Sequence, residues 1–185
     1  AALWDLKGKL ENRPVYELLG GAKYKTLPAY ATGGPSNYPL EKLLAKAEFY
    51  LSLGFNGFKI AAGGYEPGRF YVEVEPKAAA DFEANKLQFL RQRLGDDVNI
   101  MLDGHMGNSP SETWTLPTAA AVLEAVAPYK PFFFEEPLHY TDIDGYAQLR
   151  SRAKIPVAGG ECLTAQCEWQ VFADKDCFDI AQPDA

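Results

Sequence analysis

Short apolar runs alternate with longer segments of helical period along most of the chain. The runs are apolar through their whole length, which is typical of parallel strands buried on both faces. In the segments between them, apolar residues recur every three or four positions, as on one face of a helix. The alternation predicts βα units. The predicted strands are 27–34, 57–64, 99–105, 131–137, 155–163 and 178–185, and the predicted helices are 39–54, 76–95, 116–128, 143–153 and 165–174.

Two architectures produce this alternation, a doubly wound sheet and a (β/α)8 barrel of the TIM type. A doubly wound sheet would favour a glycine-rich phosphate loop after an early strand, and neither GxGxxG nor GxxxxGK[ST] occurs. A barrel places functional groups at the carboxyl ends of several strands, where this chain has acidic residues. We therefore predict an α/β fold in which residues 25–185 form about six βα units of a barrel, preceded by a helix in residues 1–24.

Composition narrows the class of protein. The 185 residues are 47% hydrophobic, enough for a substantial core, which argues against disorder. The formal net charge is −7 and the basic residues are scattered, so nucleic acid and anionic membrane surfaces are poor partners. We see neither a membrane span nor a signal peptide. The three cysteines form no CxxC or CxxH motif, so we expect reduced thiols in a cytoplasmic protein.

Three acidic residues each follow a buried strand. Asp103 ends the third predicted strand, Glu135 the fourth, and Glu161 lies near the end of the fifth. One such carboxylate could cap a helix, but three at successive strand ends of one barrel would converge at its mouth, where their repulsion requires a cation. Three oxygen ligands suit Mg²⁺ better than Zn²⁺, which prefers nitrogen and sulfur. The sequence therefore predicts a shared divalent metal site.

Glu136 follows Glu135 directly. Side chains alternate along a strand, so we expect only one of the two to point inward. The other would be a partner for a lysine or would lie behind the ligands. Spacing alone does not settle which glutamate is the ligand.

These motifs carry a resemblance to a known family. The chain resembles the enolase superfamily in its mandelate racemase and muconate lactonising branch, and within that branch the sugar-acid dehydratases. The similarity covers the whole chain, and residues 2–21 look like the last helix of the family's capping domain. Six further motifs match in the family's order: LPAYATGG (27–34), GFKI (57–60), LDGH (102–105), FEEP (134–137), GGE (159–161) and QPDA (182–185).

The resemblance implies a reaction and its ligands. Asp103, Glu135 and Glu161 would bind Mg²⁺, which helps to stabilise the enediolate formed when a proton is removed α to a carboxylate. Asp184 would orient a histidine base from the next strand. A dehydratase would convert an aldonate into a 2-keto-3-deoxy acid. The implied partners are a small sugar-acid substrate and, in the full-length protein, further copies of the same subunit.

The second predicted strand departs from a common pattern of the family. Many relatives carry Lys-x-Lys there, whereas this chain reads Lys59-Ile60-Ala61, so the lysine base is replaced by alanine. Lys59 could act electrostatically on the substrate carboxylate or form an ion pair with a strand-end carboxylate. His105 lies two residues beyond Asp103 and would be the acid that protonates the departing hydroxyl, because an imidazole can carry a proton near neutral pH. A loop role or metal ligation remains the alternative for His105.

Glu136, His139 and Arg69 are the candidate substrate-binding residues. His139 follows the fourth strand and could instead be a solvated loop histidine. Arg69 lies between Tyr65 and Tyr71 in the insertion after the second strand, where a surface role is equally compatible with the sequence. Two other functions stay open: a racemase, epimerase or cycloisomerase on the same scaffold, and a non-catalytic relative. Ala61 argues against a lysine-based racemase, and the acidic triad argues against a non-catalytic protein.

Overall fold

The computed structural model describes residues 2–35, 38–63, 74–107 and 113–184, in two compact units divided between residues 29 and 30. The first unit contains α1 (Ala2–Glu11) and α2 (Val15–Leu18), so the expectation of a single helix in residues 1–24 is wrong. Asn12 ends the first helix in the left-handed region, with φ 51°, and Pro14 caps the second. Proline lacks an amide hydrogen and therefore starts a helix rather than continuing one.

The second unit is built on one parallel sheet of six strands, hydrogen-bonded in the order of the sequence. A doubly wound sheet would reverse its strand order near the middle. The sequential order confirms the predicted barrel architecture, and the sheet is open in this chain. The strands are β1 (Ala31–Thr32), β2 (Gly57–Ala61), β3 (Asn99–Asp103), β4 (Phe134–Glu135), β5 (Val157–Gly159) and β6 (Ile180–Ala181).

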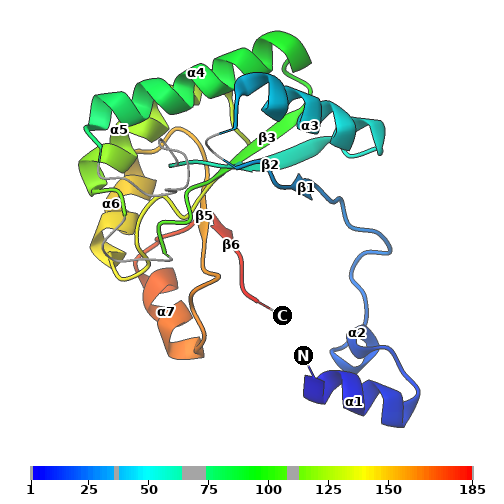
Figure 1. Cartoon of the computed structure of the whole chain (residues 1–185). Helices are drawn as coiled ribbons and strands as arrows, with labels where there is room; N and C mark the ends of the chain where they lie inside the picture. The colour runs from blue at the N-terminus through cyan, green and yellow to red at the C-terminus, as the bar shows by residue number, and fades with distance from the viewer. Residues whose placement is uncertain (1, 36–37, 64–73, 108–112, 185) are drawn as a thin grey trace. The chain divides into compact units, whose positions relative to one another are not determined.

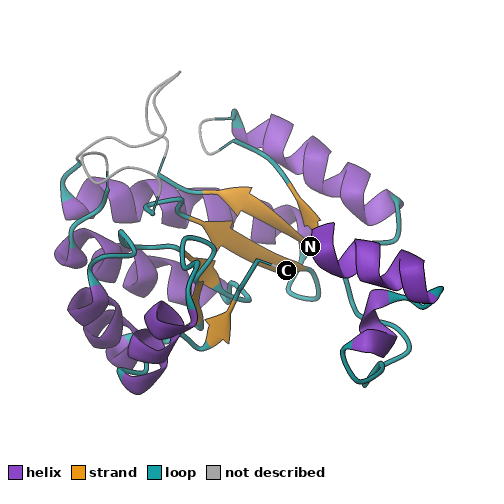
Figure 2. Cartoon of the chain, turned by 90° about the horizontal axis from the view of Figure 1, so that it is seen from below, coloured by secondary structure: helices purple, strands orange, loops and turns teal. Residues whose placement is uncertain are grey.

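Helices cover one face of this sheet (Figures 1 and 2). Right-handed crossovers between neighbouring parallel strands place every connecting helix on the same side. None of the helices in the described ranges is both long and apolar enough to cross a membrane. The connecting helices are α3 (Leu40–Ser52), α4 (Pro76–Leu94), α5 (Leu116–Val126), α6 (Ile143–Arg152) and α7 (Gln166–Asp174), each within the predicted range.

The two faces of the sheet differ in what they bury. Ile100 and Leu102 of β3 join the main core between the sheet and the helices. Met101 faces the other way and packs with Phe133 and Ala158 in a separate cluster on the concave face. Because side chains alternate along a strand, Asp103 shares the concave face with Met101. The functional side chains therefore extend from the face that a barrel encloses.

Candidate functional site

Strand register places the predicted site residues in one row. Ala61 of β2 pairs with Asp103 of β3, Asp103 with Glu135 of β4, and Glu135 with Ala158 of β5. Side chains paired in this way in a parallel sheet point to the same face. Asp103 and Glu135 therefore lie side by side at the carboxyl edge of the sheet, and both are buried, with 4% and 2% of their surface exposed.

Lys59 lies between these two carboxylates. Its Nζ atom is 2.6 Å from Asp103 Oδ2 and 2.6 Å from Glu135 Oε2. Burial alone would lower the pKa of Lys59, but the charges and hydrogen bonds of Asp103 and Glu135 outweigh burial and raise this pKa above its ordinary value. Of the two sequence-based alternatives for Lys59, the ion pair is the one present in the structure.

Gln182, just after β6, is a site residue that the sequence analysis missed. Its Nε2 atom donates a hydrogen bond to Glu135 Oε2 at 2.9 Å. The sequence could have assigned Gln182 to the site together with Asp184, because the two residues are two positions apart in QPDA and share a face in an extended segment. Asp184 is itself exposed.

His105 turns back onto Asp103. Its backbone has φ 51°, a left-handed conformation that is uncommon for a residue with a side chain. The backbone N–H donates to Asp103 Oδ1 at 3.3 Å, and ring atom Nε2 lies 3.3 Å from Asp103 Oδ2. The side chain is 37% exposed, so the ring touches a buried carboxylate and remains open to solvent.

Glu161 is an exposed side chain that follows β5 by two residues. Its pKa is raised, first by partial burial and then by the negative charges of Asp103 and Glu135, while His105 and Lys59 act in the opposite direction. The preceding Gly160 has φ 121°, and a Cβ atom there would lie 2.1 Å from Trp169 Cη2. Only glycine therefore fits the turn that presents Glu161.

A cleft of about 390 Å³ opens beside these residues. Its volume lies within the usual range of sites for small molecules. Its lining includes residues 32–35, at the end of β1 and just after it, together with charged groups from the neighbouring strand ends. The functional side chains that line the cleft are Lys59, Asp103, His105 and Glu161.

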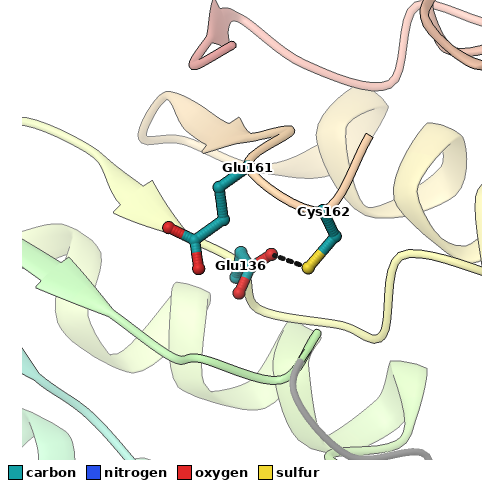
Figure 3. A group of neighbouring side chains, drawn as sticks. All are labelled: Glu136, Glu161 and Cys162. Atoms are coloured by element: carbon teal, nitrogen blue, oxygen red, sulfur yellow. Dashed lines mark hydrogen bonds between the residues drawn. The ribbon is translucent and has the colours of Figure 1, made fainter. Parts of the chain in front are cut away.

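Glu136 has a left-handed backbone conformation directly after β4. Its φ is 43°, and Glu136 is buried (1% exposed) as well as Glu135. The two glutamates have different partners, and the expectation that only one of them points inward stays a prediction. Glu136 contacts Cys162, whose Sγ atom donates a hydrogen bond to Glu136 Oε1 at 3.4 Å (Figure 3). Burial, followed by the charge of Glu161, raises the pKa of Glu136 to about 7.

Cys162 is a second residue that the sequence analysis did not assign to the site. Burial, followed by the charge of Glu136, raises the pKa of Cys162 to about 12. The thiol therefore keeps its proton beside the glutamate at neutral pH. All three cysteines are free, as expected.

Of the two remaining substrate-binding candidates, one does not line the cleft and the other lies outside the described residues. His139 sits in the loop after β4, where its Nδ1 atom is 2.7 Å from Thr141 Oγ1 and accepts a hydrogen bond from the Thr141 backbone N–H. It does not line the cleft described above. Arg69, together with Tyr65 and Tyr71, lies outside the described residues.

Comparisons with known proteins agree with this geometry. Residues 42–185 match the family described as "Enolase C-terminal domain-like". Over 99% of its length, the chain is 30% identical to arabinonate dehydratase of Saccharolobus solfataricus, and over 100% it is 32% identical to D-gluconate dehydratase of Thermoproteus tenax. It covers 44% and 35% of those proteins, which is less than half of their length.

A solved structure with the same fold is that of 3,6-anhydro-D-galactonate cycloisomerase from Zobellia galactanivorans. The TM-score is 0.81 at 34% identity, over 99% of this chain and 46% of that one. The matched family, the sequential parallel sheet and the acidic strand ends agree with one another. The chain belongs to the enolase superfamily, and its residues 42–185 match the enolase C-terminal-like domain.

Proposed function

We propose that this chain is the main part of the catalytic barrel of a Mg²⁺-dependent sugar-acid dehydratase. Relatives at 30% to 32% identity are named as dehydratases of arabinonate, gluconate and galactonate. The proposed reaction removes a proton α to the substrate carboxylate and eliminates water to give a 2-keto-3-deoxy acid. The assembly of the full-length protein into a homo-oligomer stays a prediction.

The observation that carries the proposal is the single cation position between Asp103 and Glu135. The Lys59 ammonium lies 2.6 Å from an oxygen of each carboxylate, so both side chains converge on one positive charge. Glu161, coupled electrostatically to both, would add a third oxygen. This donor set fits Mg²⁺, which prefers carboxylate oxygens. When bound, the ion would stabilise the negative charge that develops on the substrate.

Residues of the chain would supply the other functions that the reaction needs. Lys59 would hold positive charge near the substrate carboxylate, opposing its repulsion by the acidic cluster. His105 would donate a proton from its ring to the departing hydroxyl, since the ring lines the cleft and is partly exposed. Ala61 leaves room on β2 where relatives carry a lysine base. Asp184 would orient the base that removes the α proton.

The test is product analysis on a panel of aldonates with the full-length protein. Mg²⁺-dependent formation of a 2-keto-3-deoxy acid is expected, together with its loss in Asp103→Asn. Asp81→Asn is the matched control, because Asp81 is an exposed aspartate on α4 paired only with a neighbouring lysine in the described contacts. Equal activity in the two variants would refute the metal assignment.

One observation favours a second function. The Zobellia structure, at 34% identity, is named as a cycloisomerase of a galactonate derivative. The same acidic edge could support isomerisation, because both reactions begin with removal of a proton α to a carboxylate. The substrate distinguishes the two: ring opening of a 3,6-anhydro aldonate to an isomeric acid, with no loss of water from any open-chain aldonate, would favour the cycloisomerase and refute the dehydratase.

A further inference from the structure

A thiol and two carboxylates meet where the segments after β4 and β5 come together. Glu136 follows β4, whereas Glu161 and Cys162 follow β5. One ligand atom from each of the three lies within 4.8 Å of the others. Figure 3 shows the Glu136 carboxylate between the carboxylate of Glu161 and the thiol of Cys162. We name these three residues the thiol–carboxylate cluster.

One oxygen of this cluster lacks a partner. Oε1 of Glu136 accepts the hydrogen bond from Cys162, whereas Oε2 is buried and has no hydrogen-bond partner among the described residues. Glu136 as a whole is only 1% exposed. A buried carboxylate oxygen without a partner is costly, on the order of 1–3 kcal/mol or more, and such a group calls for an explanation. A cation beside the Cys162 sulfur that is held by both carboxylate oxygens of Glu136 would satisfy Oε2.

The backbone at Gly107 packs closely against two of these donors. Gly107 faces the cluster from the loop after β3, and a Cβ atom there would lie 2.6 Å from Glu136 Oε1 and 2.9 Å from Cys162 Sγ. Both distances are shorter than a normal contact, so any other residue at this position would push the two donors apart. The glycine therefore preserves the arrangement of the cluster.

The donor chemistry indicates the class of ion, and the separation of two donors is compatible with it. Two ligands of a tetrahedral zinc ion, one sulfur and one oxygen, lie about 3.5 Å apart, given bond lengths of about 2.3 Å and 2.0 Å. The separation between Cys162 Sγ and Glu136 Oε1 is 3.4 Å. Glu161 is exposed, so its side chain can rotate to close the remaining gap. Sulfur is a poor ligand for Mg²⁺ and a good one for Zn²⁺ or Co²⁺.

We propose that Glu136, Glu161 and Cys162 form a second metal site, selective for a thiophilic divalent cation such as Zn²⁺ or Co²⁺. Binding transfers the thiol proton to solvent and leaves a sulfur–metal bond. The site shares Glu161 with the proposed Mg²⁺ site. A thiophilic ion therefore draws Glu161 away from Asp103 and Glu135 and inhibits the Mg²⁺-dependent reaction.

The test is a Co²⁺ titration of the full-length protein, followed by absorption spectroscopy. A thiolate-to-cobalt charge-transfer band is expected in the near ultraviolet, and Zn²⁺ should abolish it. Cys162→Ser loses the band, whereas Cys167→Ser keeps it, because Cys167 is an exposed thiol outside the cluster. Gly107→Ala is an independent variant that replaces no ligand but displaces two donors, and it should weaken Co²⁺ binding about tenfold or more.

Three results would overturn the proposal: no band in the parent protein, a band that persists in Cys162→Ser, or unchanged Co²⁺ affinity in Gly107→Ala. A circular dichroism spectrum of each variant establishes that it is folded. The readout needs neither substrate nor Mg²⁺ and does not depend on the proposed dehydration. A protein that fails to dehydrate aldonates could therefore still show the cobalt band. Absence of the band would likewise not bear on the dehydration.

Discussion

A buried ion pair in α4 supports the end of β2, and its removal should be far more costly than removal of a surface pair on the same helix. Lys86 Nζ lies 2.7 Å from Glu83 Oε2, and the two residues are 1% and 0% exposed. Lys86 also donates to the Ala61 carbonyl at 3.1 Å, and Glu83 Oε1 accepts from the Gly63 N–H at 3.0 Å. The pair therefore binds the backbone just beyond Lys59.

The perturbation is Lys86→Met, which keeps the length of the side chain and removes its charge. Glu83 would then be a buried carboxylate without its cation, a change that costs about 3–5 kcal/mol. The Ala61 carbonyl would also lose its donor, at about 1 kcal/mol or more. We expect the free energy of unfolding to fall by roughly 3–5 kcal/mol, because the two costs overlap.

The assay is urea denaturation followed by circular dichroism, with Lys77→Met as the matched control. Lys77 forms an ion pair with Asp81 on the same helix, and their side chains are 84% and 65% exposed. Exposed pairs contribute about 0–1 kcal/mol, so this variant should change little. If the two substitutions cost the same, the buried pair does not stabilise the end of β2 as argued.

Three further predictions follow from the site. In metal-free protein, Glu136 has its pKa raised from 4.5 to about 7, so the folded state holds this proton more tightly than the unfolded chain. The contribution of this proton to the free energy of unfolding is full below pH 4.5 and is lost as the pH rises through about 7. Glu136→Gln should therefore flatten the dependence of the unfolding free energy on pH in this range. Lys59→Met should tighten Mg²⁺ binding about tenfold in calorimetry, since a like charge leaves the site, yet abolish turnover; weaker binding would contradict this. Gly160→Ala should lower stability and Mg²⁺ affinity together, because the new methyl group meets Trp169; an unchanged melting temperature would show that the turn adapts.

The pattern of apolar and polar residues was sufficient to predict the order of strands and helices. Each predicted strand and barrel helix contains the observed one, because burial on both faces of a parallel sheet requires continuous apolar runs and the covering helices require a periodic stripe. The acidic ends of those runs located Asp103 and Glu135. Strand alternation also places Gln182 on the face of the site residues, although the sequence analysis did not assign it a role.

Backbone conformation and packing decided the rest. Glu136 has a left-handed backbone and is buried like Glu135, which the periodicity of the sequence does not predict. Cys162 carries no metal motif in its own segment, because Glu136 comes from the end of another strand. The ion pair of Lys59 depends on three strands in register. Arg69 lies outside the described residues, and its role stays a prediction. Periodicity determines which face of an element is buried, whereas contacts between the ends of different strands exist only after the sheet has formed.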